Sequence, residues 1–400
     1  MHPFLRKILD ATRLTREGRL VEATAAIREA VASPTEAGTH VSREHGDDVI
    51  DVDAVEVPSS DKDDAVETGP IGEPLDAVDD PVAEPGTEHR PTPGEGRFIE
   101  SSFTGSAGTL AFKLFVPGGR DGDALPLVVM LHGCTQNPDD FAAGTRMNEI
   151  AQEQGFLVLY PAQSQRANGQ RCWNWFSPRH QKRGSGEPAL IAGMTRHIVQ
   201  THSVDRDRVY VAGLSAGGAM AAILAREYPD VFAAGGVHSG IAPGAARDVA
   251  SALAVMRSGP GAAWPLPAFG AAADSAPTRR SAPLIVFHGD ADTTVAIANA
   301  DAVLASAIGD PAVVATTTRG IAARGERAFR RTVWRRSEDD DAASVAEHWV
   351  VHGSPHAWSG GDASGSFTDP AGPDASREML RFFADHPRVS SVAEAVGSST

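Results

Sequence analysis

Cysteine is nearly absent from this sequence of 400 residues, which contains only Cys134 and Cys172. Two cysteines exclude a disulfide-rich scaffold, and these two lack the spacing of a metal site. Long apolar runs are missing as well. None approaches the roughly 20 residues that cross a bilayer, so we expect no transmembrane segment. Residues 1–7 are followed by charged sequence, without the apolar core and cleavage site of a secretion signal.

The chain also lacks an excess of positive charge. Its formal net charge is −16, which argues against nucleic acid as the main partner. Residues 41–90 hold 16 Asp and Glu against 3 Lys and Arg, so about −13 lies in this segment and about −3 in the remainder. The acidity belongs to one segment and therefore says little about an active site.

Two segments precede a larger domain. Residues 1–32 are predicted to form a helical hairpin, because apolar residues recur at helical spacing on both sides of Gly18. The hairpin packs on itself or on the main domain, or it docks on a hydrophobic surface or another protein. Residues 33–97 are rich in Asp, Glu, Pro and Gly. Such a segment buries too little apolar surface to offset the entropy of ordering, so we predict a disordered acidic linker.

Residues 98–387 are predicted to form an α/β domain whose mostly parallel sheet is covered by helices on both faces, because strand and helix patterns alternate. The expected strands are residues 112–116, 126–131, 156–160, 208–214, 232–236, 284–287 and 346–351. The expected helices are residues 139–154, 188–199, 216–226 and 374–383. Residues 242–282 interrupt the alternation and are expected to form an insertion over the site. Residues 388–400 are expected to fray.

The most informative motif is Gly-x-Ser-x-Gly at residues 213–217. It follows a β-branched run and precedes an alanine-rich helical pattern, which is the context of a nucleophile elbow. Gly213 and Gly217 allow the backbone to pass close to itself at so tight a turn. Ser215 is therefore the candidate nucleophile.

A serine hydroxyl needs a base, and the base needs a carboxylate that orients it. His356 lies after the last expected strand among small residues and is the candidate base, favoured over His348 and His352. The acid is Asp292 or Asp290, which both follow the strand at residues 284–287. We favour Asp292, because Asp290 is better placed to brace the turn. The order Ser, Asp, His is that of the α/β-hydrolases.

The oxyanion of an ester-hydrolysis intermediate needs at least two preorganised donors. The backbone N–H of Ala216, just after the nucleophile, is one candidate. The N–H of Cys134, after the strand at residues 126–131, is the other. Cys134 and Cys172 are either independent buried thiols or a single bridge, which would imply an oxidising compartment. His132, which precedes Gly133 and Cys134, belongs to the loop that supplies this second donor, or it only forms hydrogen bonds within that loop.

Three tryptophans near these motifs, Trp173, Trp175 and Trp358, are candidate walls of the substrate site. Ordinary packing is the alternative for each of them. The sequence shows no metal cluster and no phosphate-cradling loop, so we expect no cofactor.

Five phrases of the sequence together resemble the polyhydroxybutyrate depolymerase family of α/β-hydrolase esterases. They are LHGCTQ at 131–136, CWNWF at 172–176, GLSAGGAM at 213–220, HGDAD at 288–292 and HAWSGG at 356–361. The resemblance covers roughly residues 98–385. It implies a triad of Ser215, Asp292 and His356, and a Cys134–Cys172 bond beside the oxyanion hole.

The resemblance also implies hydrolysis of short-chain polyhydroxyalkanoates or their oligomers through an acyl-enzyme. Related enzymes act on feruloyl or acetyl esters of plant polysaccharides, which is the alternative substrate class. A granule- or partner-binding protein with an inactive hydrolase fold is the non-enzymatic alternative. The family is usually extracellular, as the cysteine pair also indicates. The lack of a visible signal peptide favours instead a cytoplasmic protein that residues 3–32 attach to a hydrophobic granule.

Overall fold

The computed structural model describes residues 95–120, 122–261, 281–309, 313–321, 326–336 and 343–388. The predicted hairpin of residues 1–32, the predicted linker up to residue 94 and the tail after residue 388 lie outside these ranges. None of the described helices is both long and apolar enough to cross a membrane.

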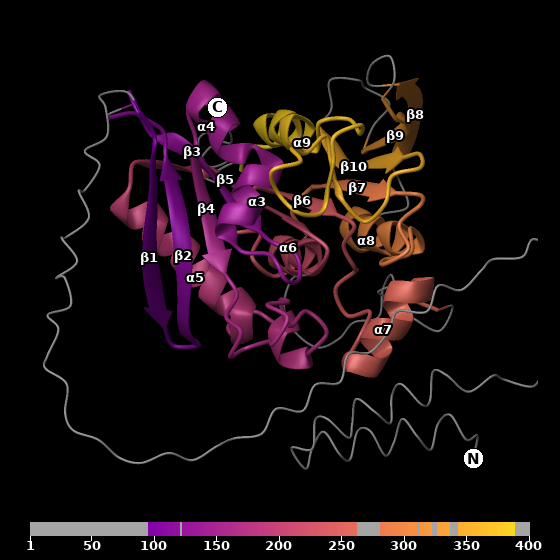
Figure 1. Cartoon of the computed structure of the whole chain (residues 1–400), viewed down its shortest axis with the longest axis horizontal. Coiled ribbons are helices and arrows are strands. Elements are labelled where there is room, and N and C mark those ends of the chain that lie inside the picture. The colour runs from indigo at the N-terminus through magenta and orange to yellow at the C-terminus, as the bar shows by residue number, and fades with distance from the viewer. Residues whose placement is uncertain are drawn as a thin grey trace, which may run out of the picture. The chain divides into compact units, whose positions relative to one another are not determined.

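The described domain is built on one large mixed sheet (Figure 1). Its strands are β1 (Arg97–Gly105), β2 (Gly108–Val116), β3 (Leu125–Leu131), β4 (Leu157–Ala162), β5 (Val204–Leu214), β6 (Ala234–His238), β7 (Leu284–Gly289), β8 (Val314–Ile321), β9 (Ala328–Arg335) and β10 (Ser344–Val351). Their order across the sheet is β1-β2-β4-β3-β5-β6-β7-β10-β9-β8. A short pair, β11 (Trp358–Ser359) and β12 (Thr368–Asp369), forms a separate parallel ribbon.

The centre of the sheet is parallel and its two ends are antiparallel. Neighbouring strands from β4 to β10 run in the same direction. The pairs β1–β2, β2–β4, β10–β9 and β9–β8 are antiparallel. The α/β-hydrolase fold with a mostly parallel sheet is thus confirmed. The sequence analysis missed β1, β8 and β9, because these strands near the two ends of the sheet are largely exposed or half-buried and lack the continuous apolar run of strands buried on both faces.

The helices are α3 (Pro138–Thr145), α4 (Met147–Gln154), α5 (Gly186–Thr201), α6 (Ala216–Glu227), α7 (Val249–Ser258), α8 (Ala298–Ile308) and α9 (Ala375–Ala384), with a 3₁₀ turn at Pro178–Gln181. The single helix expected over residues 139–154 was wrong. Arg146 adopts a left-handed conformation with φ 54°, which ends α3 and starts α4. The helices α7 and α8 were not predicted, and α7 lies within the expected insertion.

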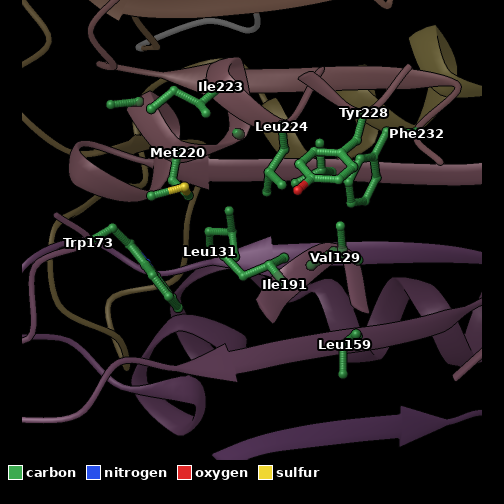
Figure 2. Close-up of a cluster of buried hydrophobic side chains, with 14 of the residues drawn as sticks. Val129, Leu131, Leu159, Trp173, Ile191, Met220, Ile223, Leu224, Tyr228 and Phe232 are labelled. Carbon is green, nitrogen blue, oxygen red and sulfur yellow. The ribbon is translucent and has the colours of Figure 1, made fainter. Parts of the chain in front are cut away.

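Alternate residues of the central strands bury against opposite helical layers. In β3, Leu127, Val129 and Leu131 join one core with α5 and α6, as Figure 2 shows for part of this cluster. Val128 and Met130 face the other core, which contains residues of α3, α4 and α9. Helices therefore cover both faces, and the period of two along each strand decides which layer each side chain meets. Loops at the carboxyl ends of the parallel strands are left to build a site.

Candidate active site

Ser215 occupies a sharp turn between β5 and α6. Its φ of 58° lies in the left-handed region, which a non-glycine residue adopts only when the surrounding structure imposes it. A Cβ on Gly217 would lie 1.9 Å from the carbonyl oxygen of Leu131, and one on Gly213 would lie 2.4 Å from the backbone of Gly217. The Ser215 N–H donates to the His238 carbonyl at 2.9 Å. Close packing against β3 and β6 thus holds the serine at the carboxyl end of β5.

The structure brings Asp292 and His356 together. His356 Nδ1 lies 2.7 Å from Asp292 Oδ2, while Oδ1 accepts from the N–H groups of Thr294 and Val295 at 2.9 and 2.8 Å. The Asp292 side chain is fully buried and that of His356 is 10% exposed. An aspartate that accepts from Nδ1–H keeps the imidazole in the tautomer whose Nε2 is free to accept a proton.

Burial raises the pKa of the Asp292 carboxyl, but its contacts with His288 and His356 outweigh burial and hold that pKa well below its usual range. His288 Nε2 donates to the carbonyl of Val295 at 2.8 Å and also lies 3.5 Å from Asp292 Oδ2. The carboxylate is therefore ionised at neutral pH. It carries the negative charge that would stabilise an imidazolium at His356.

Asp290 serves a different histidine. Its Oδ2 lies 2.7 Å from His352 Nδ1, and its Oδ1 accepts from the N–H of Gly353 at 2.6 Å. This carboxylate braces the loop that leads to His356.

His238 is a second imidazole in the immediate surroundings of His356. Its Nε2 accepts from the N–H of Ser359 at 3.0 Å, and its ring stacks between Phe287 and Trp358. Burial, together with the nearby His288 and His356, lowers the pKa of His238 to about 3. His238 is therefore neutral with its acceptor nitrogen occupied, so it is not available to accept a proton from the serine.

The loop after β3 leaves one of its backbone donors open. The N–H of Gly133 donates to Gln136 Oε1 at 2.9 Å, and the N–H groups of Thr135 and Gln136 donate to backbone carbonyls. Within the described residues, the N–H groups of Cys134 and Ala216 have no backbone or side-chain acceptor. Gly133 approaches the elbow closely, since a Cβ on it would lie 3.6 Å from the Ser215 Cβ.

A disulfide joins Cys134 to Cys172. Beside it, the buried Trp173 donates from Nε1 to the carbonyl of His132 at 3.1 Å. His132 Nδ1 donates to the Gly133 carbonyl at 2.8 Å, and burial lowers the pKa of His132 to about 4. The loop is therefore fixed by one covalent bond and by neutral hydrogen-bonding groups.

The expectation that tryptophans form walls of the site does not agree with their burial. Trp173, Trp175 and Trp358 are 0%, 5% and 1% exposed. Trp358 donates from Nε1 to Ser376 Oγ at 3.1 Å and packs its face on His238. In this structure the indoles of Trp173 and Trp358 pack within the cores of the domain, and Trp175 leaves only a small part of its surface accessible.

Sequence reasoning missed a polar network that links the loop after β3 to the loop before β12. Gln136 Nε2 donates to Asp140 Oδ2 and to the carbonyl of Ser366, each at 3.0 Å. The Ser366 N–H and Oγ–H both donate to the Asp140 carboxylate. Gln136 is the last residue of the LHGCTQ phrase at 131–136, but its partner Ser366 is 230 positions away. Only the fold therefore reveals the link.

Comparison with known proteins places this architecture in a family. The model of the esterase PHB depolymerase family matches residues 110–328. Poly(3-hydroxyalkanoate) depolymerase C of Paucimonas lemoignei is 37% identical over 203 residues, which are 50% of this chain and 48% of that protein. Feruloyl esterase B of Thermothelomyces thermophilus is 38% identical over 140 residues, which are 35% of this chain and 47% of that protein.

The chain thus spans about half the length of these curated relatives. Among solved structures, an acetyl xylan esterase from Aspergillus awamori superposes with a TM-score of 0.56 at 19% identity, covering 73% of this chain and all of that chain. This similarity shows the fold. The family match covers more than half of the 400 residues, so the chain belongs to the esterase PHB depolymerase family of α/β-hydrolases.

Proposed function

We propose that this protein is a serine esterase in which Ser215 is the nucleophile and His356 the general base. Asp292 orients this base and stabilises its positive charge. The observation that carries the proposal is the buried Asp292–His356 hydrogen bond of 2.7 Å, in a domain whose Ser215 occupies a nucleophile elbow at the carboxyl end of β5. Among the described residues, His356 pairs its Nδ1 with the buried, ionised Asp292, and its Nε2 has no hydrogen-bond partner.

Ser215 Oγ attacks the ester carbonyl carbon while His356 Nε2 accepts the hydroxyl proton. The carbonyl oxygen becomes an oxyanion that accepts hydrogen bonds from the N–H groups of Cys134 and Ala216. Collapse of this intermediate breaks the ester bond, and His356 gives its proton to the departing alkoxide. Water then hydrolyses the acyl-enzyme by the same steps and releases the acid.

Within the described structure no hydrogen bond joins Ser215 Oγ to His356 Nε2. The proposal therefore requires the Ser215 hydroxyl to turn toward the imidazole when substrate binds. Such contacts are often long in a free enzyme and shorten in the substrate complex.

For the substrate we propose short-chain polyhydroxyalkanoates, above all poly-3-hydroxybutyrate or its oligomers. Family membership and the similarity to a poly(3-hydroxyalkanoate) depolymerase support this choice. Feruloyl or acetylxylan-type esters are the second candidate, supported by the similarity to feruloyl esterase B. The Cys134–Cys172 disulfide supports an oxidising, extracellular location.

Hydrolysis of p-nitrophenyl butyrate by wild type, Ser215→Ala and Ser102→Ala tests the activity. Ser102 is an exposed serine on β1 and serves as the matched control. We expect Ser215→Ala to lose at least about 10⁴-fold in kcat, as removal of a triad nucleophile does, and Ser102→Ala to match wild type. Equal activity of all three proteins would refute the role of Ser215, and an inactive wild type would favour a binding protein.

Product analysis separates the substrate classes. Wild type is incubated with 3-hydroxybutyrate oligomers, feruloylated xylan and acetylated xylan, and the released acids are identified. Release of 3-hydroxybutyrate is the expected result, whereas release of ferulate or acetate alone would favour the carbohydrate esterase.

Deletion of residues 1–40 tests whether the N-terminal segment attaches the protein to granules. An unchanged affinity for granules would refute that attachment.

A further inference from the structure

Phe367 is an exposed aromatic residue with a constrained backbone. The residue is 46% exposed, and its φ of 53° lies in the left-handed region. A bulky side chain in that region costs free energy, and such residues cluster where function requires them. Leaving the ring in water forfeits burial as well. Neither feature stabilises the folded domain.

The loop around Phe367 is held on both sides. On one side, the carbonyl of Ser366 accepts from Gln136 Nε2 at 3.0 Å, and the N–H of Ser366 donates to Asp140 Oδ1 at 2.8 Å. On the other side, the carbonyl of Phe367 accepts from the N–H of Trp358 at 2.7 Å. The exposed ring therefore projects from a fixed backbone.

The ring of Phe367 lies beside the proposed general base. Its centroid is 6.5 Å from that of His356, with an interplanar angle of 77°. The Nδ1 side of His356 is occupied by Asp292, so reaction takes place on the Nε2 side. The proton on Nε2 passes to the leaving alkoxide, which places the alcohol part of the ester against the imidazole. An exposed ring beside that imidazole can touch the same part of the substrate.

We propose that Phe367 determines specificity by contacting the alcohol part of the ester, and that this part is an apolar group such as the next hydroxyalkanoate unit of a polyester chain. The inference rests on the proposed function. It predicts an effect on leaving-group selectivity during acylation and no effect on deacylation, since the alcohol has departed before the acyl-enzyme is hydrolysed.

The experiment uses two esters that form the same butyryl-enzyme, methyl butyrate and benzyl butyrate. For each we compare kcat/KM in wild type, Phe367→Ala and Phe367→Trp. Loss of an aromatic contact is worth about tenfold, so Phe367→Ala is expected to lower the ratio of kcat/KM for benzyl over methyl butyrate about tenfold. Phe367→Trp should retain most of the ratio. The rate of deacylation of the shared butyryl-enzyme should not change in either variant.

Phe98→Ala is the matched control. Phe98 is also exposed, at 36%, and its ring also meets another ring edge-on, that of Tyr160 at 5.5 Å. It lies on β1, four strands from β5 in the sheet, so its ratio should equal that of wild type.

Two results would overturn the inference while leaving the proposed function intact. One is an unchanged ratio in Phe367→Ala, including one that accompanies an equal loss with both esters. The other is a slower deacylation in Phe367→Ala, which would mark a structural role. A wild type that hydrolyses neither ester would overturn the proposed function and this inference together.

Discussion

Two aspartates on one turn form hydrogen bonds of equal length in different surroundings. Asp290 and Asp292 each lie 2.7 Å from the Nδ1 of a histidine. The side chains of Asp290 and His352 are 37% and 45% exposed, whereas those of Asp292 and His356 are 0% and 10% exposed. Water screens an exposed pair, so its net contribution is small. The comparison shows that burial, not distance, separates the proposed catalytic pair from the bracing pair.

The largest expected effect is that of Asp292→Asn. An amide cannot fix the same tautomer of His356 or stabilise its charge, and a comparable change in a serine protease lowers kcat about 10⁴-fold. We expect a loss of this order with p-nitrophenyl butyrate. A loss below tenfold would show that burial does not distinguish the two aspartates.

Gln136→Ala tests whether the contacts that hold the loop after β3 affect kcat, as we expect the burial of Asp292 to do. The variant removes the acceptor of the Gly133 N–H and the link to Ser366. Removing one oxyanion donor costs about 10²–10³-fold in kcat, and a loosened loop should cost less, so we expect roughly 10- to 100-fold. The exposed Gln200 of α5 provides the control, because Gln200→Ala should keep full kcat. Equal activities of the two variants would contradict this account.

Buried neutral histidines predict how stability depends on pH. Burial is the main cause that lowers the pKa values of His238 and His348 to about 3. Both values lie below the ordinary histidine pKa, so the unfolded chain binds more protons than the folded domain between about pH 6 and pH 4. The free energy of unfolding therefore decreases as the pH is lowered, by at most about 1.4 kcal/mol per pH unit for each such histidine.

Urea unfolding at pH 6, 5 and 4 measures this slope. We expect a decrease of roughly 1–3 kcal/mol per pH unit and a shallower slope in His348→Gln. A free energy of unfolding that stays constant over this range would mean that these imidazoles are not held neutral.

The smallest expected effect is that of Asp290→Asn. The pair is exposed, so its loss should lower the free energy of unfolding by at most about 1 kcal/mol and leave kcat within about threefold of wild type. Together with Asp292→Asn this variant completes the comparison of the two pairs. A loss of kcat as large as that of Asp292→Asn would show that bracing the loop is as important for catalysis as stabilising the charge on His356.

The sequence predicted the parts of the site that local chemistry determines. The elbow was readable because the tight turn at Ser215 requires small neighbours and follows a buried parallel strand. The choice of Asp292 over Asp290 followed from position in the turn, and the structure pairs Asp292 with His356. Each of these features depends on a few adjacent residues.

Features that depend on tertiary packing were not predictable. The tryptophans near the motifs looked like walls of the site, but the fold buries them. The break at Arg146 and the strands β1, β8 and β9 near the ends of the sheet lack a strong local signal. Phe367 gave no signal at all, because its exposure and its contact with His356 arise only when β12 pairs with β11.

Covalent labelling with a fluorophosphonate, read by intact mass and peptide mapping, asks most directly whether His356 and Asp292 activate Ser215. We predict one adduct per chain, on Ser215, with labelling lost in Ser215→Ala, at least about 10³-fold slower in His356→Ala and unchanged in Ser102→Ala. An adduct on another residue, or equally fast labelling of Ser215 without His356, would contradict the account.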